Sequence, residues 1–506
     1  MTESIPNPPS KQLSAAKQLR KAKQHRTARG FCLTSGFWMM IATFMGLLGA
    51  TELIAPDLSG KLGWIVFGRV RPMHVNLVLF GFVTPGLLAA AFYYLPRMLD
   101  TDLFSESLGR LTVVLWNIAL IFIVLSISAG FSQGREYAEM IWPVDMLIVI
   151  VFALVFFNFV MTVARRKEPI LYVSVWYACA AVVLTGLTFS LGNVIWKPDT
   201  GALVGIPDAI LLWFYGHNIF GLLLTPLSLG AAYYVIPRVC RNPLYSHTLS
   251  LVGFWSLILI YTHIGTHHLL QVPVPTWLKV IAIVDSIGMV IPVLVVLINL
   301  WYTAKGRLGE IHADIGGKFI FTGTIMYFFV SIQGSMMALP QVQRITHFNN
   351  WVVAHAHIGV LGFAGMIALG GIYYVLPRVT GKPLYSRFLA DFQYWLVLIG
   401  VTGFTVVLTI AGLIQGNAWF NGETVYRVLP EIHMYYIVRA SLGLLIFVSA
   451  ILGFYNIART VFGRPAEAPA VAASETATTE TPPPQELAHQ NLAHQNLALA
   501  EQEVGQ

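Results

Sequence analysis

Seven histidines of this 506-residue chain lie in or beside long apolar stretches, and they are the first sign of chemistry. They are His74, His217, His263, His267, His268, His355 and His357. Ionisable side chains inside a membrane are costly and usually functional. Imidazole binds copper, zinc and haem iron. A lone histidine is more often a hydrogen-bonded core residue, but a set this dense predicts metal centres.

His355 and His357 are two residues apart in Trp351-Val-Val-Ala-His-Ala-His. At about 100° per residue they project about 200° apart on a helix, so they cannot share one metal. They can bind two haems on opposite sides of that helix, with His74 as the second axial ligand of one. Two axial histidines close a haem for electron transfer, whereas a single one leaves a face open to a small gas.

His267 and His268 are neighbours, about 100° apart on a helix, and can converge on one ion with His217 as the third ligand. Three neutral imidazoles in apolar surroundings favour copper, although a three-histidine zinc site is the alternative. The lack of nearby carboxylates argues against magnesium, calcium or manganese in this triad. An open haem iron facing copper would form a binuclear site for a diatomic molecule.

Tyr261 lies six residues before His267. On a continuous helix it would sit about 9 Å nearer the cytoplasm, where protons from inside would arrive. It is either a redox-active phenol or an ordinary hydrogen-bonded core tyrosine. We expect His263 to have a structural or water-linked role.

The elements that position these residues are transmembrane helices. The chain is 56% hydrophobic and only 11% charged, which excludes a soluble globular protein. Stretches of about 20 apolar residues predict a polytopic all-α membrane protein with twelve helices. They start near residues 33, 72, 108, 141, 170, 205, 248, 277, 317, 350, 389 and 432. The three cysteines (Cys32, Cys179 and Cys240) lie far apart and predict neither disulfides nor thiolate metal sites.

The 31 Lys and Arg residues are topology signals rather than a nucleic-acid surface. Most fall in the N-terminal arm and the loops of one side, which predicts both termini in the cytoplasm. Three regions follow: a basic cytoplasmic arm (1–30), a twelve-helix catalytic domain (31–462) and a disordered tail (463–506). The tail is rich in Ala, Glu, Thr, Pro and Gln. The first helix is too long and its leader too basic for a cleavable signal, so it stays in the membrane.

An internal repeat orders the helices. Tyr-Tyr, one or two residues and Pro-Arg recur with the prolines at 96, 237 and 377, which are 141 and 140 residues apart. His74, His217 and His357 precede these prolines by 22, 20 and 20 residues. This predicts three pseudo-repeated four-helix units around a threefold axis, each with a histidine on its second helix. The simpler alternative is that the motif is only a common interfacial helix end.

The chain resembles subunit I of the cbb3-type cytochrome c oxidases, the C-family branch of the haem–copper oxygen reductases. The resemblance extends from about residue 60 to 455. It rests on Arg69-Val-Arg-Pro-Met-His74, Gly134-Arg-Glu-Tyr-Ala-Glu-Met-Ile-Trp-Pro143, Trp213-Phe-Tyr-Gly-His-Asn218, Tyr261 through His268, His347 through His357, and His433-Met-Tyr-Tyr-Ile-Val-Arg439.

The resemblance implies a role for each site residue. His74 and His357 would bind a low-spin haem b, and His355 the high-spin haem b. His217, His267 and His268 would bind copper B, and Tyr261 would be the tyrosine cross-linked to the first copper histidine. Glu136 would bind calcium near the haem propionates. Arg71 and Arg439 would pair with propionates, although an interfacial arginine that reaches the membrane surface is equally consistent.

The implied activity is reduction of oxygen to water, with coupled proton uptake, in a bacterial inner membrane. Electrons would come from membrane-anchored c-type cytochrome subunits and a soluble cytochrome c, because the chain lacks a Cys-x-x-Cys-His motif. The alternative is a nitric oxide reductase, which typically holds non-haem iron with a glutamate one turn after the first histidine. Gly221 occupies that place here and Tyr261 is retained, which favours oxygen. A transporter or a purely electron-carrying cytochrome would leave the three copper histidines without a role.

Two stretches depart from the family pattern. The family usually has a glutamate before Gly-Pro-Met-Met, whereas this chain reads Gln333-Gly-Ser-Met-Met337. This change removes a carboxyl group near the haem pocket and alters proton handling there. The family's Gly-Pro-His-His reads Gly265-Thr-His-His268, a milder change.

Overall fold

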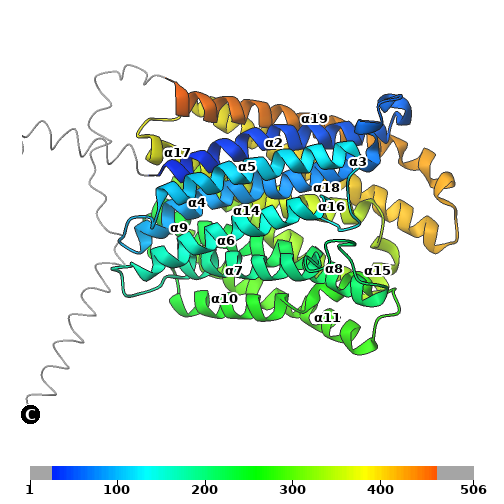
Figure 1. Cartoon of the computed structure of the whole chain (residues 1–506), viewed down its shortest axis with the longest axis horizontal. Helices are drawn as coiled ribbons and strands as arrows, with labels where there is room; N and C mark the ends of the chain where they lie inside the picture. Colours follow the sequence, from blue (N-terminus) through cyan, green and yellow to red (C-terminus); the bar gives the residue numbers. More distant parts are fainter. Residues whose placement is uncertain (1–24, 464–506) are drawn as a thin grey trace, which may run out of the picture.

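The computed structural model describes residues 25–463 as an all-helical bundle with its long helices side by side (Figure 1). Within these residues, eleven helices are long and apolar enough to cross a membrane, and His247–Tyr261 is a shorter apolar helix. Together they account for the twelve predicted segments. Residues 1–24 of the predicted arm and 464–506 of the predicted tail lie outside the described residues.

The helices follow the chain in three groups. The first contains α2 (Arg26–Glu52), α3 (Phe67–Asn76), η3 (Leu77–Val83), α4 (Thr84–Met98), α5 (Glu106–Ala129) and α6 (Trp142–Ala164). The second contains α7 (Val173–Gly192), α8 (Ile206–Ile219), η4 (Phe220–Leu224), α9 (Thr225–Cys240), α10 (His247–Tyr261), η5 (Ile264–Leu269), α11 (Thr276–Gly288) and α12 (Val290–Ala304). The third contains α13 (Leu308–Ala313), α14 (Ile315–Met337), α15 (Pro340–Thr346), α16 (Asn350–His357), η6 (Ile358–Gly365), α17 (Met366–Thr380), α18 (Arg387–Phe420) and α19 (Val425–Phe462).

The largest boundary differences are at the first and last membrane helices. They begin at Arg26 and Val425, whereas apolar composition predicted starts near residues 33 and 432. Composition marks the part of a helix in hydrocarbon, but the backbone hydrogen bonds of these helices continue into the polar flanks. Each of the two helices therefore begins about two turns before its predicted start.

One hydrogen-bonded clasp recurs in each unit and supports the threefold repeat. The side chain of Asn158 in α6 accepts from the Ser105 backbone N–H at 3.2 Å and donates to the Ser105 carbonyl at 3.0 Å. Asn299 in α12 makes the same pair of bonds to Ser246 at 2.9 and 2.8 Å. Asn456 in α19 repeats them with Ser386 at 3.0 and 2.8 Å. Each clasp ties the start of the third helix of a unit to the fourth.

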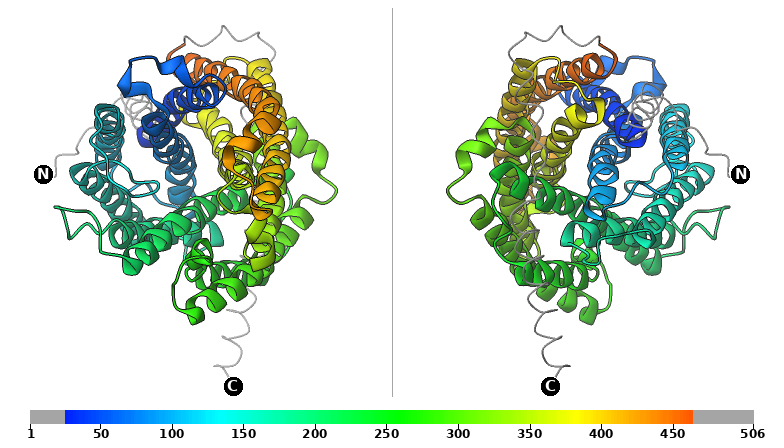
Figure 2. Two further views of the ribbon diagram at one scale, coloured as in Figure 1. Left: turned by 90° about the vertical axis from the view of Figure 1, so that its right-hand side faces the viewer. Right: turned by 90° about the vertical axis from the view of Figure 1, so that its left-hand side faces the viewer.

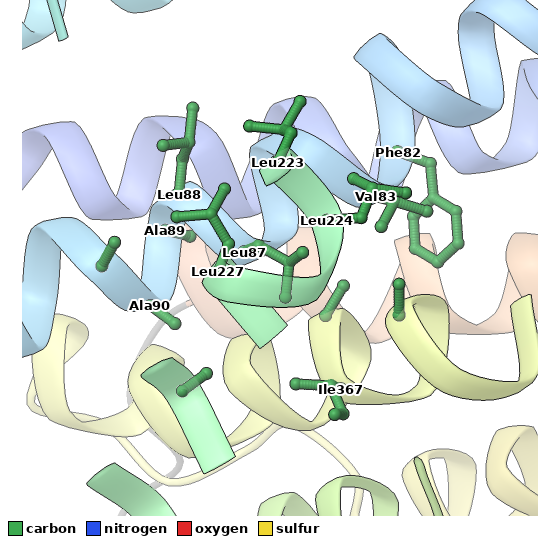
Figure 3. Packing of buried hydrophobic residues seen from close by; sticks show 14 of the residues in the cluster. Phe82, Val83, Leu87, Leu88, Ala89, Ala90, Leu223, Leu224, Leu227 and Ile367 are labelled. Atoms are coloured by element: carbon green, nitrogen blue, oxygen red, sulfur yellow. The ribbon is translucent and has the colours of Figure 1, made fainter. Parts of the chain in front are cut away.

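The second helices of the three units meet at the centre of the bundle. Helices α4, α9 and α17 contact one another, and the views along the bundle show the other helices around them (Figure 2). Their buried leucine, alanine and isoleucine side chains interdigitate there (Figure 3). The Tyr234 ring lies 5.3 Å from Tyr94 and 6.2 Å from Tyr374. The repeated tyrosines thus belong to the core and are more than interfacial anchors.

A π-helical segment interrupts each of these second helices. The three segments found in residues 25–463 are η3, η4 and η6, and each begins within three residues of His74, His217 or His357. A π turn is wider than an α turn and is frequent at functional sites. It changes the direction of the histidine relative to the rest of the helix, so the same local device orients all three histidines.

Candidate metal centres

The structure brings His217, His267 and His268 together. One potential ligand atom from each lies within 4.8 Å of the others. Among the described residues, this is the one cluster of at least three His, Cys, Asp or Glu side chains that could hold a metal ion. Nδ1 of His217 lies 3.1 Å from Nε2 of His268. Two imidazole nitrogens that each lie about 2 Å from one metal are about 3 Å apart, so this spacing fits a shared ion.

The end of α10 sets the position of this triad. The α-helix stops at Tyr261, and His267 and His268 lie in the 3-10 helix η5. The prediction of a continuous α-helix from Tyr261 to His267 is wrong, so the α-helical rise used for the estimate of about 9 Å does not apply to this segment. Gly265 allows η5 to pack against α8, because a Cβ atom there would lie 2.4 Å from the Trp213 carbonyl oxygen. A larger residue at 265 would push the histidines away from His217.

Tyr261 lies against the first histidine of the triad. Its ring is nearly parallel to the His217 ring, with 4.8 Å between centroids and 18° between planes. Tyr261 also contacts Gly221 in η4, where a Cβ atom would lie 1.7 Å from Cε1 of Tyr261. Only glycine fits at 221 while Tyr261 keeps this position, so a glutamate in that place is incompatible with the observed site.

His74 and His357 face each other from different units. Their rings are nearly parallel, at 16°, and their centroids are 6.2 Å apart. Two imidazoles bound to opposite sides of one iron, with metal–nitrogen bonds of about 2 Å and ring centroids about 1 Å further out, would have centroids about 6 Å apart. The pair therefore fits the two axial positions of one haem.

The hydrogen bonds of His74 and His357 use Nδ1 and leave Nε2 of each ring available to bind a metal. Nδ1 of His74 lies 2.8 Å from the Ala42 carbonyl, and Nδ1 of His357 lies 2.8 Å from the Val353 carbonyl. A carbonyl only accepts, so both Nδ1 atoms carry the proton and both Nε2 atoms present a lone pair. Gly46 makes room for the first ring, because a Cβ atom there would lie 2.5 Å from Cε1 of His74.

His355 has different neighbours from His357 although both lie on α16. The His355 ring lies near Gly334 of α14, where a Cβ atom would be 3.4 Å from its Cε1. The His357 ring packs on Phe404 of α18 at 4.3 Å. His355 also lies close enough to His217 for electrostatic interaction, and its Nδ1 is buried without a partner in the structure. One helix thus carries a histidine toward the triad and another toward His74.

The two predicted arginines lie near the His74–His357 pair, because both interact electrostatically with His74. Nη2 of Arg71 donates to Glu136 at 2.5 Å. The Arg439 guanidinium lies 5.6 Å from the Phe404 ring, and its Nε is buried without a partner in the structure. Both positions suit a negatively charged substituent next to this pair. Glu136 belongs to no group of three potential ligands in residues 25–463, so calcium binding stays a prediction.

Sequence reasoning assigned no specific contacts to three groups near these sites. Glu139 is buried in the loop before α6 and accepts from Nδ2 of Asn76 at 2.5 Å. Burial raises the pKa of Glu139 to about 7, and the Glu-Tyr-Ala-Glu stretch was the available signal for it. For His263 the sequence predicted a structural or water-linked role without a named partner. In the structure its Nδ1 lies 3.5 Å from Oδ2 of Asp285 in α11. Gln333 carries a buried Oε1 without a partner in the structure.

Comparisons with known proteins agree with one another. The family described as Cytochrome C and Quinol oxidase polypeptide I matches residues 26–445. The cbb3-type cytochrome c oxidase subunit CcoN1 of Stutzerimonas stutzeri is 32% identical over 458 residues, covering 87% of this chain and 96% of that protein. Cytochrome c oxidase subunit 1 of Rhodobacter capsulatus is 30% identical over 454 residues, covering 86% and 85%. A solved haem–copper terminal oxidase dimer has a similar fold, with a TM-score of 0.74 at 16% identity and coverage of 87% and 85%.

Proposed function

We propose a role for each site residue of this chain. The chain belongs to the cytochrome c and quinol oxidase polypeptide I family and is a cbb3-type subunit I, and thus a haem–copper oxygen reductase. His74 and His357 would hold a low-spin haem b, and His355 would hold a high-spin haem b. His217, His267 and His268 would hold copper B. When bound, the haem iron and the copper would supply the redox chemistry for reduction of oxygen to water.

The observation that carries this proposal is the placement of Tyr261 between Gly221 and His217. The nearly parallel contact, with 4.8 Å between the ring centroids, holds the phenol next to the proposed copper ligand His217. From there the phenol Oη can give up a proton and the ring an electron, which supplies part of the four-electron requirement. A covalent bond between Tyr261 and His217 would fix the same arrangement.

The same observation argues against nitric oxide reduction. A glutamate one turn after the first histidine is the typical additional ligand of the non-haem iron in those enzymes. At position 221 the space for any side chain is taken by the Tyr261 ring, 1.7 Å from where a Cβ atom would lie. We therefore propose oxygen as the substrate.

Charged groups around the haem pair complete the proposal. Arg71 and Arg439 would neutralise haem propionates, and Glu136 would contribute to a calcium site beside them. The electron donors are membrane-anchored c-type cytochrome subunits of the same complex and a soluble cytochrome c, because this chain has no Cys-x-x-Cys-His motif. Protons are taken up from the cytoplasm, the side of both termini, in a bacterial inner membrane.

Metal analysis and gas consumption by the purified complex test the proposal. We expect one copper and two b haems per subunit I, and consumption of oxygen in preference to nitric oxide with one reduced cytochrome c as donor. The variant His268→Ala should lose turnover and copper yet keep the low-spin haem spectrum. Non-haem iron in place of copper, or full activity of His268→Ala, would refute the assignment.

A further inference from the structure

Ser286 of α11 makes a direct hydrogen bond to a histidine of the triad. Ser286 is buried, with only 3% of its surface exposed. Oγ of Ser286 lies 2.7 Å from Nδ1 of His267, and the same hydroxyl donates to the Ala282 carbonyl at 2.5 Å. No part of the proposed reaction uses this serine.

The two bonds of Ser286 fix the tautomer of His267. A hydroxyl has one proton, and here that proton goes to the Ala282 carbonyl, which can only accept. The hydroxyl oxygen must then accept from His267, so Nδ1 of His267 carries the proton and Nε2 presents its lone pair. An imidazole that binds a metal through Nε2 needs this tautomer, and a hydrogen bond at the other nitrogen also sets the ring orientation.

Two further helices hold Ser286 and His267 in place. Oγ of Ser335 in α14 donates to the backbone carbonyl of Ser286 at 2.8 Å. Nε2 of Gln343 in α15 donates to the backbone carbonyl of His267 at 2.7 Å. Ser335 stands where the family pattern has a proline, which cannot make this side-chain bond, so this connection belongs to the departure Gln333-Gly-Ser.

We propose that Ser286 is a positioning residue for the copper site: its hydroxyl selects the Nε2-ligating tautomer of His267 and holds the ring toward His217 and His268. Ser335 supports it by fixing the backbone of α11 at Ser286. The inference rests on the proposed copper site and adds a residue that determines how tightly the site binds its metal. Loss of such a partner typically lowers metal affinity by about 10- to 100-fold.

A matched pair of variants isolates the hydroxyl. Ser286→Thr and Ser286→Val have side chains of nearly the same shape, but only threonine keeps the hydrogen bond. The purified complexes are equilibrated with increasing concentrations of the Cu(I) chelator bathocuproine disulfonate, and copper is measured per haem. We expect Ser286→Val to bind copper about 10- to 100-fold more weakly than Ser286→Thr, and so to lose it at lower chelator concentrations. The infrared stretch of carbon monoxide on the reduced copper should shift in Ser286→Val and stay near the wild-type position in Ser286→Thr.

Controls separate the outcomes. Ser256→Ala removes a hydroxyl that donates to the Val252 carbonyl within α10 at 2.6 Å and makes no bond to histidine, so its copper retention should equal that of wild type. If the added methyl of both variants prevents assembly, Ser286→Ala against wild type gives the same comparison, with the low-spin haem spectrum as the check of folding. Equal copper retention with and without the hydroxyl would overturn the inference. A wild-type complex that holds no copper would instead overturn the proposed function.

Discussion

Replacing Gly221 by alanine tests whether the contact between η4 and Tyr261 is required for activity. The new Cβ atom would lie 1.7 Å from Cε1 of Tyr261, whereas two carbon atoms in contact are about 3.5 to 4.0 Å apart. The Tyr261 ring must therefore move by about 2 Å, away from its parallel position on His217. Helix propensity alone would favour alanine by about 1 kcal/mol, and overpacking costs about 1 to 3 kcal/mol. The fold should therefore survive while the site is displaced.

The effect on turnover should be large because the substitution displaces the Tyr261 ring from its position beside His217. A displacement of about 1 Å near a reacting centre can lower the rate about 100-fold. We expect Gly221→Ala to lower oxygen consumption per low-spin haem by at least that factor, with copper content and the low-spin haem spectrum little changed. Oxygen electrode measurements with reduced cytochrome c, normalised to haem, give the result.

Gly186 of α7 offers the matched control. It is also a helical glycine of a membrane helix, but a Cβ atom there meets nothing within 4 Å. Gly186→Ala should keep wild-type turnover. If Gly221→Ala were as active as Gly186→Ala, the Tyr261 ring would not need its observed place, and the argument for oxygen from Gly221 would fail.

Three further predictions concern the haem pair, a carboxyl group and the repeated clasp. His357→Ala should remove the low-spin haem spectrum, since His74 would lose the partner ring 6.2 Å away, while copper stays bound; an unchanged spectrum would contradict the axial pairing. Because burial raises the pKa of Glu139 from 4.5 to about 7, stability should fall by at most about 3 kcal/mol as pH rises through this interval, and thermal unfolding of Glu139→Gln should lack this dependence. Asn299→Ala should lower the unfolding temperature, at a cost of about 1 to 3 kcal/mol for the unpaired Ser246 groups, without loss of either haem; equal unfolding temperatures would refute a stabilising role.

The sequence predicted the number and order of the membrane helices because each apolar stretch is long enough to cross the bilayer by itself. It also predicted the different neighbours of His355 and His357, since the angle between residues on one helix depends only on their separation. The end of α10 at Tyr261 was not predictable in this way. The break depends on Gly265 packing against the Trp213 carbonyl, which is a contact between elements far apart in the chain.

Other features were visible in the sequence but needed the structure to be understood. The clasp residues Asn158, Asn299 and Asn456 follow the same Asn-x-x-x-Thr spacing. Each threonine (Thr162, Thr303 and Thr460) accepts from the backbone N–H of the residue before the clasped serine. This spacing has no chemistry of its own, so it gave no signal until the bonds to the helix starts were known. The π-helical segments were hidden for a similar reason, because no residue type marks a π turn.

The three units place equivalent histidines on equivalent helices, yet the sites they form differ. Each of His74, His217 and His357 precedes a π-helical segment, so local backbone structure does not distinguish them. The difference comes from what each ring meets. His74 and His357 meet each other, which suits a haem with two axial ligands, whereas His217 meets His267 and His268 because α10 ends early. A repeated scaffold therefore presents the three histidines. The early end of α10 in the second unit brings His267 and His268 to His217, whereas the equivalent His74 and His357 face each other.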